Sequence, residues 1–237
     1  MADMYTERIL AYGDILGWTE AIEACENQAD YDRIKKAIDH IHEYAKNFAL
    51  HIKEKVSKAV GPNVPLQEYL GIEFAFFSDS FAVSIPADDG YRIFDILSNI
   101  CHPLLCSNFL TRGGITMGSL HHVENVIFGP ALIEAHRLEQ EAVYPRLLCS
   151  SKLLDHLSRF SRSANYIVTD HLGRQIANLL AFSQQPQKYI MNPRWDLSGT
   201  SERVENQIRS HSGAGQEKKA EKWRYMRDVL RLMDPRT

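Results

Sequence analysis

The feature that most constrains the fold of this chain is a predicted β-hairpin. Residues 70–77 and 81–85 are rich in aromatic and β-branched side chains, and only Ser78, Asp79 and Ser80 lie between them. Two strand-forming runs joined by so short a connection are typical of an antiparallel hairpin. The pattern therefore places Asp79 at the hairpin tip.

A short strand and a long amphipathic helix are predicted before the hairpin. Residues 7–13, which include an apolar run at residues 9–12, predict a short buried strand that stops at Asp14. Gly17 permits a tight turn into the following helix. Apolar residues then recur at helical spacing to about residue 58, with Asp30 as the expected N-cap. A carboxylate is therefore expected at the end of the first strand.

Helices and strands alternate after the hairpin. Residues 91–110 predict a buried helix with a kink near Pro103, and residues 113–120 predict a strand. Pro130 opens a helix that runs to about Ala142, because proline is tolerated in the first turn. Two further strands are expected at residues 146–149 and 166–168, on either side of a helix at residues 151–160. The order βαββαβ predicts an α/β (α+β) ferredoxin-like fold, in which helices pack on one face of an antiparallel sheet.

The C-terminal part is more polar than the rest of the chain. With 237 residues, 44% of them hydrophobic, the chain can bury one substantial core. We therefore expect one domain over residues 1–175 and an extension over residues 176–237. Residues 192–215 predict a loop, followed by an amphipathic helix with Trp223, Met226, Leu230 and Met233 on one side. Its other face is expected to be solvated and carries Lys218, Lys219, Lys222 and Arg227.

The charge balance and the cysteines limit the classes of partner and compartment. A formal net charge of −3 gives no basic field for a nucleic-acid polymer, so any phosphate binding has to be local. The four cysteines are scattered and lack paired spacing, which favours a reduced, cytoplasmic setting. No stretch approaches the roughly 20 apolar residues of a membrane span, and no leader pattern is present. Neither secretion nor membrane insertion is predicted.

Asp14 and Asp79 are the candidate metal ligands. If the first strand pairs between the two hairpin strands, these carboxylates lie side by side at the strand ends. Paired carboxylates favour Mg²⁺ or Mn²⁺, which take oxygen ligands and bridge to substrate phosphates. The backbone carbonyl of Ile15 offers one more oxygen. The backbone N–H groups of residues 15–19 are placed to hold a triphosphate, and Thr19 resembles a helix N-cap.

Four segments resemble, in the same order, the motifs of class III nucleotidyl cyclases. Residues 12–19 are similar to the first metal motif, residues 77–83 to the second, residues 112–118 to the Gly-Ile-x-x-Gly strand, and residues 128–139 to the catalytic helix. The ordered set covers roughly residues 8–150. The resemblance implies a class III cyclase fold and a nucleotidyl cyclase domain, with the extension as an addition to it.

The resemblance also implies a role for each matching residue. In that family two aspartates bind two divalent ions, Mn²⁺ or Mg²⁺, and the 3′-hydroxyl of a nucleoside triphosphate attacks its own α-phosphate with loss of pyrophosphate. Asp14, Ile15 and Asp79 match the metal ligands, and Arg137 matches the catalytic arginine. The implied substrate-binding residues are Tyr12, Leu16, Gly17, Trp18, Thr19, Phe77 and Arg112. Because the family builds its site between two domains, a homodimer is implied, with Arg137 reaching in from the other protomer.

Three positions depart from the family pattern. Ile133 replaces the catalytic asparagine, so the group that orients the ribose is missing. Ala75 replaces the lysine that selects adenine, and the acidic partner of that lysine maps near Val126. A site cannot read a purine by hydrogen bonds with alanine and valine, which argues against an adenylate cyclase. Three aromatic residues can narrow the pocket instead: Tyr12, Phe76 and Phe77.

A narrower resemblance concerns the base. Residues 112–115, 128–135 and 138–146 are similar to the bacterial pyrimidine cyclases of the Pycsar anti-phage systems. The similarity implies a UTP or CTP substrate, a cyclic UMP or cyclic CMP product, and a separate effector that senses the product. UTP is favoured over CTP. The sequence does not fix the base, the activator, or the role of residues after about 170.

Other functions and roles stay open. A degenerate, non-catalytic nucleotide-binding module is supported by the missing asparagine, but two retained aspartates repel each other unless a cation lies between them. A diguanylate cyclase or polymerase palm is disfavoured, because the Gly-Gly-Asp/Glu-Glu/Asp-Phe hairpin of the former is absent. Arg137 could equally pair with Glu134 or Glu141 on the helix surface. His121 and His122 lack ligand partners and are expected at the surface or in a turn.

Overall fold

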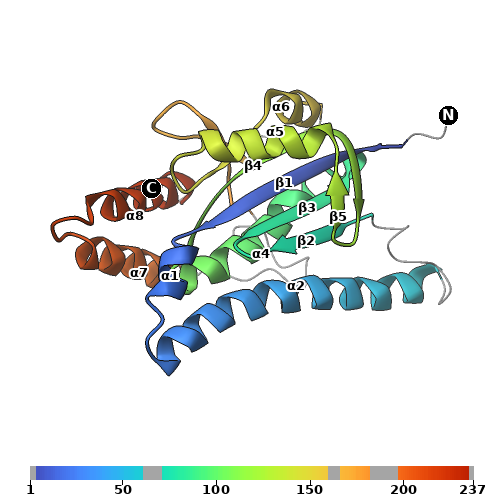
Figure 1. The fold of residues 1–237 in the computed structure, drawn as a ribbon. Coiled ribbons are helices and arrows are strands. Elements are labelled where there is room, and N and C mark those ends of the chain that lie inside the picture. The colour runs from blue at the N-terminus through green and yellow to red at the C-terminus, as the bar shows by residue number, and fades with distance from the viewer. Residues whose placement is uncertain (1–3, 61–70, 160–165, 182–196, 235–237) are drawn as a thin grey trace.

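A computed structural model describes residues 4–60, 71–159, 166–181 and 197–234 (Figure 1). Its eight-stranded sheet has the order β2-β3-β1-β4-β6-β8-β7, with β5 paired to β4. The strands are β1 (Thr6–Leu16), β2 (Glu73–Phe77), β3 (Ser80–Pro86), β4 (Leu110–Val123), β5 (Val126–Phe128), β6 (Leu147–Cys149), β7 (Ile167–Thr169) and β8 (Gln175–Ala177). The helices are α1 (Trp18–Glu23), α2 (Gln28–Val60), α4 (Arg92–Cys106), α5 (Pro130–Glu141), α6 (Ser151–Leu157), α7 (Leu197–Ser210) and α8 (Glu217–Met233), with a 3-10 turn, η1, at Ala87–Asp89.

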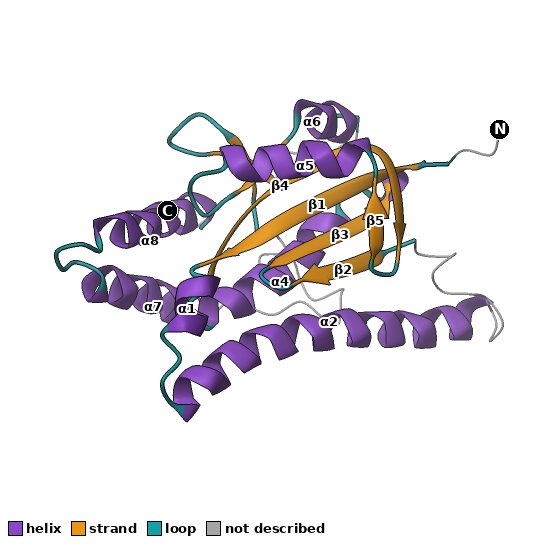
Figure 2. Cartoon of the chain, viewed as in Figure 1, coloured by secondary structure: helices purple, strands orange, loops and turns teal. Residues whose placement is uncertain are grey.

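The two longest strands, β1 and β4, form the centre of the sheet, as Figure 2 shows. Alternate residues of β1 point to opposite faces, so Ile9 and Ile15 belong to the larger core with α2, α4 and α6, while Leu10 packs on the other face against α5. The expectation that helices cover one face only is therefore wrong. The sheet is also not purely antiparallel, because β4 and β6 run parallel.

Glycines in β4 let α5 approach the second face closely. A Cβ atom on Gly114 would lie 2.4 Å from the Cβ of Leu138 and 2.5 Å from the carbonyl oxygen of Ala135. Any other side chain at this position would push α5 away from the sheet. The Gly-Ile-x-x-Gly strand thus sets the distance between the sheet and the helix that resembles the catalytic helix.

The predicted hairpin is confirmed, but its place in the sheet differs from the expectation. Ser78 and Asp79 form the turn between β2 and β3, and Ser78 adopts a left-handed conformation with φ of 53°. β1 pairs with β3 and β4, and does not lie between β2 and β3. The register pairs Asp14 with Ser80 on one side and with Arg112 on the other.

Two helix caps differ from the predictions. α2 begins at Gln28, and Asn27 caps it in place of Asp30: the side-chain oxygen of Asn27 accepts from the backbone N–H of Asp30, whose carboxylate accepts from the Asn27 amide. At α1 the N-cap is Gly17, with φ of 81°, and not Thr19. Glycine is suited to this left-handed position, which turns the chain sharply after β1.

The C-terminal segment is more helical than its polar composition predicts. α7 lies within residues 192–215, where a loop was expected; residues 192–196 fall outside the described ranges. Thr200, Val204 and Ile208 are spaced by four and form its buried side. This narrow apolar stripe packs with α8, whose predicted amphipathic face is confirmed. The division of the chain at residue 175 stays a prediction.

Two further findings concern the environment of the chain. None of the helices in the described ranges combines the length and apolar character that crossing a bilayer requires. The four cysteines are free thiols: Cys101 and Cys149 are buried, as expected of small hydrophobes, whereas Cys25 and Cys106 are only partly buried.

Candidate active site

The two predicted metal ligands meet at one end of the sheet. Asp14 lies on β1 opposite Ser80, and Ser80 directly follows the turn that carries Asp79. The backbone N–H of Ile15 donates to the carbonyl oxygen of Asp79 over 2.7 Å, which fixes the hairpin tip beside the end of β1. Asp14 and Asp79 thus lie at the same end of the sheet, but the strand order differs from the expectation, and β1 continues past Asp14 to Leu16.

Arg112 connects Asp14 to a further carboxylate, on α5. Its Nη2 lies 3.3 Å from the Asp14 Oδ2, and its Nε lies 2.6 Å from the Glu139 Oε1. The Nε and Oε1 atoms are buried, and despite this short distance they are not aligned as a hydrogen bond. The guanidinium therefore lies between Asp14 and Glu139, and the charge of Asp79 also acts on Asp14.

The electrostatics of this cluster favour a cation. Burial raises the pKa of Asp14, the Arg112 guanidinium opposes that rise, and the nearby charges of Glu139 and Asp79 add to it. A raised pKa of a carboxyl group means that its negative charge is held at a cost. A bound cation would relieve that cost.

The donor set fits a hard divalent ion. Carboxylate and carbonyl oxygens are the ligands that Mg²⁺ and Mn²⁺ prefer. In the part of the chain that the structure describes, no three His, Cys, Asp or Glu side chains are arranged as a complete metal site. Asp14 and Asp79 would therefore leave coordination positions for water and phosphate oxygens, as in sites where Mg²⁺ is shared with a phosphorylated substrate. The side chain of Ile15 is buried in the core, so only its backbone can contribute.

Glu139 is the site residue that the sequence reasoning missed. It is a single turn beyond Ala135 and two turns beyond Ala131, and all three face the sheet. A glutamate on the apolar stripe of a helix is rarely buried without a charged partner. That irregularity was the available signal, but the partner, Arg112, is far away in the sequence.

The remaining predicted substrate residues divide into two groups. Tyr12 is partly buried and packs edge-on against His136 of α5, with ring centroids 5.5 Å apart, and Phe77 is 40% exposed at the end of β2. Thr19 is exposed. Trp18, however, is buried against Phe109 and lines a separate cavity beside the hairpin tip, together with Ser78 and Ser80. Leu16 and Gly17 line a cavity at the start of α1.

Phe76 lines the cavity beside the hairpin tip, together with Ser78 and Ser80. It packs against His42 of α2, with ring centroids 4.7 Å apart, on the sheet face opposite α5. Ala75 is fully buried between the sheet and α5. Val126 is 58% exposed in β5. Neither Ala75 nor Val126 offers a polar side-chain atom to a base.

Arg137 is exposed on α5 and available for an intermolecular contact. The alternative partners on its own helix are engaged elsewhere, since Glu134 pairs with Lys152 and Glu141 pairs with Arg174. Ile133, on the same helix, is 65% exposed. The side of α5 that faces away from the sheet therefore presents both the catalytic-arginine position and the position that lacks the asparagine.

Two other polar residues are buried. Arg146 has its Nη1 2.5 Å from the Asp170 Oδ2, so this guanidinium is not available to bind a phosphate. His122 is 5% exposed, which corrects the expected surface position. Its Nδ1 lies 2.7 Å from the Ser84 Oγ, and burial lowers its pKa to about 4.

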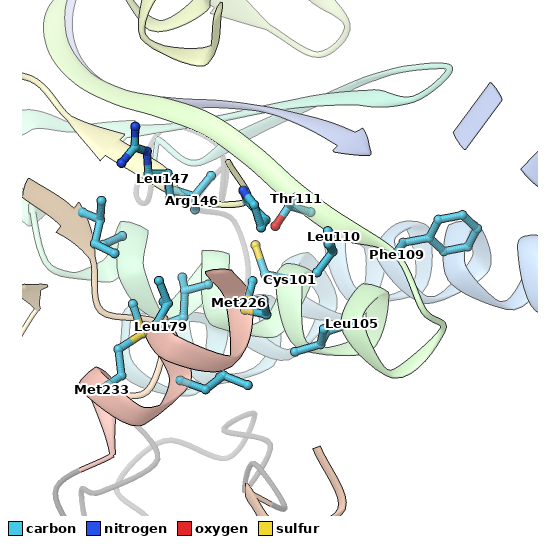
Figure 3. Close-up of a pocket in the computed structure, with 15 residues that line it drawn as sticks. Cys101, Leu105, Phe109, Leu110, Thr111, Arg146, Leu147, Leu179, Met226 and Met233 are labelled. Carbon is cyan, nitrogen blue, oxygen red and sulfur yellow. The ribbon is translucent and has the colours of Figure 1, made fainter. Parts of the chain in front are cut away.

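A small apolar cavity lies away from the carboxylates, between β4, α4 and α8 (Figure 3). Its volume of about 20 Å³ has room for roughly one water molecule. Met226 and Met233 reach it from α8, and Cys101 from α4. Burial raises the pKa of Cys101 to about 12, so this thiol is unreactive. The cavity is a packing gap in the core.

The comparisons with known proteins concern the fold. No protein-family model and no curated protein matches the sequence. Among solved structures, the chain is similar to the adenylyl cyclase CyaB from P. aeruginosa, with 14% identity, a TM-score of 0.50, and coverage of 73% of this chain and 92% of that chain.

Two guanylyl cyclase structures match with TM-scores under 0.5. Cya2 has 13% identity, a TM-score of 0.45, and coverage of 74% of this chain and 91% of that chain. The guanylyl cyclase domain of the RhoGC fusion protein from the aquatic fungus Blastocladiella emersonii has 12% identity and a TM-score of 0.44, with coverage of 73% of this chain and 95% of that chain. The assignment of the fold therefore rests on the match to CyaB, whose TM-score is 0.50. The fold of this chain is therefore that of a nucleotidyl cyclase domain, as its four ordered motifs predict.

Proposed function

We propose that this chain is a metal-dependent nucleotidyl cyclase. The observation that carries the proposal is the meeting of Asp14 and Asp79 at one sheet end, with Arg112 and Glu139 beside them. The fold places these groups where two strand ends and a helix converge. A purely structural role for the two carboxylates is a weaker explanation, because adjacent carboxylates repel each other and a fold without a ligand has no need of them.

Each residue of the cluster has a defined task in such a reaction. Asp14 and Asp79 would hold two Mn²⁺ or Mg²⁺ ions, which, when bound, neutralise phosphate charge and lower the pKa of the attacking hydroxyl. Arg112 is placed to donate to phosphate oxygens beside Asp14. Glu139 holds the Arg112 side chain against α5. Positioning and charge neutralisation supply most of the rate in phosphoryl chemistry of this kind.

The site is proposed to be completed by a second copy of the chain. Arg137 is exposed and unengaged by its helix neighbours, so it can serve a partner's site. Large apolar side chains are exposed on α5 and at the nearby β4–β5 hairpin: Val123, Val126, Phe128 and Ile133. Apolar groups left in solvent favour a protein contact. Two equivalent sites would result, each with metal ligands from one protomer and Arg137 from the other.

The proposed substrate is a pyrimidine nucleoside triphosphate, with UTP favoured and CTP as the alternative. Support comes from the apolar side chains at Ala75 and Val126, which offer no hydrogen bond to a purine. The product would be 3′,5′-cyclic UMP, made as a second messenger in anti-phage defence and sensed by a separate effector.

A competition experiment tests the choice of base. The purified chain would be incubated with Mn²⁺ and an equimolar mixture of ATP, GTP, CTP and UTP, and the cyclic products identified by mass spectrometry. The expected result is cyclic UMP in excess over the other three products. Cyclic CMP as the main product would support the alternative substrate, and cyclic AMP or cyclic GMP would refute pyrimidine selectivity.

A mixing experiment tests the shared site. Asp14→Ala and Arg137→Ala each remove a group from both sites of a homodimer, but a heterodimer of the two variants keeps one intact site. Each heterodimer formed by mixing the inactive variants should therefore have up to about half of the activity of an unaltered dimer. Heterodimers confirmed by native mass spectrometry that stay inactive would count against the shared site.

A non-catalytic nucleotide-binding module is the second candidate. Two observations favour it: Ile133 stands exposed where the family has its asparagine, and Arg112 lies on Asp14. On this view the chain binds a nucleoside triphosphate with metal and releases it unchanged.

A further inference from the structure

A second cavity lies where the C-terminal helices meet the cyclase-like part of the chain. It has a volume of about 380 Å³ and extends from the β1–α1 turn, at Leu16 and Gly17, to α7 and α8. Figure 1 shows β1 running into α1 from the sheet, and residues of α1 line the cavity together with Gln207 of α7. The cavity is thus next to the segment that follows Asp14.

Basic side chains from separate elements line this cavity. Arg33 comes from α2, and Lys219 and Lys222 come from α8, together with His211 after α7. The carboxylate in the lining is that of Glu20. Three permanent positive charges against one negative charge give the cavity an excess of positive charge, although the whole chain has a net charge of −3.

Arg33 is held at the cavity wall, whereas Lys219 is exposed. The Arg33 guanidinium lies 5.1 Å from the centroid of the Phe109 ring, which fixes it at the cavity wall. Lys222 is partly buried. Within the described ranges, no carboxylate lies within ion-pairing distance of Arg33, Lys219 or Lys222. Like charges that face one cavity repel each other, so an anion bound there would stabilise the arrangement.

We propose that this cavity is a binding site for a phosphate-rich anion, of the size of a pyrophosphate or triphosphate group. An arginine and two lysines supply the positive charge and the N–H donors that phosphate oxygens accept. Lys219 and Lys222, from the basic face of α8, thus line this cavity with Arg33.

Two sources can supply such an anion. One is the phosphate tail of a nucleoside triphosphate whose α-phosphate lies at Asp14 and Asp79; this source rests on the proposed function. The other is a separate ligand, such as free pyrophosphate or a phosphorylated regulator. In both cases α8 would contribute directly to phosphate recognition.

The test measures the binding of inorganic pyrophosphate to the full chain by calorimetry, in EDTA so that metal plays no part. Lys219→Gln/Lys222→Gln should weaken binding by about tenfold or more, because a single hydrogen bond between charged groups changes affinity by about that factor. Lys218→Gln/Arg224→Gln, two exposed changes on the same helix, is the matched control and should bind as the unaltered chain does. Lys219→Arg/Lys222→Arg should retain binding within about threefold.

The result that would overturn the proposal is equal pyrophosphate affinity in the Lys219→Gln/Lys222→Gln variant and the unaltered chain, or no binding to either at millimolar concentration. UTP and UMP then separate the two sources. If Lys219→Gln/Lys222→Gln binds UTP more weakly than the unaltered chain does but binds UMP equally well, the anion is the triphosphate tail. If the variant binds both nucleotides as the unaltered chain does, the anion is a separate ligand. Neither measurement needs turnover, so failure of the cyclase proposal would not be mistaken for failure of this one.

Discussion

Two aspartate–arginine clusters of this chain have similar members and opposite properties. In the first, Arg146 and Tyr225 both lie 2.5 Å from the Asp170 Oδ2, and the Asp170 Oδ1 accepts from two backbone N–H groups. In the second, Asp14 and Glu139 share Arg112, whose Nε is not aligned as a hydrogen bond. The Asp170 cluster is internally satisfied, and the Asp14 cluster is not.

The pKa values of the two aspartates express this difference. Burial alone would raise the pKa of Asp170, but hydrogen bonds from Tyr225, the backbone and Arg146 lower it overall. The pKa of Asp14 is raised, by burial and by nearby carboxylates, against the effect of Arg112. A satisfied cluster stabilises the fold and joins α8 to the sheet. An unsatisfied one costs stability and keeps its capacity for a ligand.

The largest expected effect is on the satisfied cluster. Asp170→Asn should destabilise the chain by about 3–5 kcal/mol, because it leaves the Arg146 guanidinium buried without its counter-charge. Urea unfolding measures the loss. Glu141→Gln, which breaks the exposed pair with Arg174, should cost no more than about 1 kcal/mol. Equal losses in the two variants would remove the distinction between the clusters.

Metal should act on the other cluster. Mn²⁺ at about ten times its dissociation constant should stabilise the chain by about 1.4 kcal/mol, which raises the melting temperature by about 3–6 °C. Asp14→Asn and Asp79→Asn should abolish this shift. Asp88→Asn, at an exposed carboxylate of η1, is the control and should keep it. A shift that survives both active-site changes would place the metal elsewhere.

Glu139→Gln should disturb the position of Arg112 without affecting the binding of Mn²⁺. Arg112 would lose the charge that holds it against α5, so kcat should fall about tenfold while the Mn²⁺-induced stabilisation stays. Glu139→Asp should recover part of the activity. Unchanged kcat in Glu139→Gln would mean that Glu139 only anchors α5.

The smallest effect is a difference of sign in the pH dependence of stability. Because the folded-state pKa of Asp14 is raised, its charged form opposes folding, so Asp14→Asn should stabilise the metal-free chain by up to about 1 kcal/mol at pH 7. The gain should disappear as the pH falls below about 4. Asp170, whose pKa is lowered, contributes stability that is present above about pH 4 and is lost as the pH falls through its folded-state pKa. Urea unfolding of the unaltered chain, Asp14→Asn and Asp170→Asn from about pH 2 to about pH 7.5 measures both effects, and the same sign for the two variants would contradict the comparison.

The part of the site that the sequence predicted depends on local patterns. A strand that carries Asp14 and a two-strand pattern that turns at Asp79 can each be identified within a few residues, although β1 continues to Leu16 and does not stop at Asp14. Glu139 and Asp170 could not be identified in this way, because their roles depend on arginines that only the folded chain brings near. Burial of a charge depends on tertiary contacts, which a local pattern does not contain.

The errors about the fold have similar causes. α7 has only a narrow apolar stripe, so its composition resembles that of a loop until α8 covers the stripe. The position of α5 on the second face depends on the close approach at Gly114, which the sequence shows only as a glycine in a strand. The resemblance to the cyclases supplied the order of the motifs, and the structure supplied the contacts between them.

The most direct test of the central claim is to follow the products formed from UTP and from CTP with Mn²⁺, by mass spectrometry and a pyrophosphate assay together. The unaltered chain should release a cyclic pyrimidine nucleotide and pyrophosphate in equal amounts, and Asp14→Ala and Asp79→Ala should each lower the rate by at least about 10³-fold while the chain stays folded. A cyclic product formed at an undiminished rate by either variant, or no cyclic product from any of the four nucleoside triphosphates, would contradict the account.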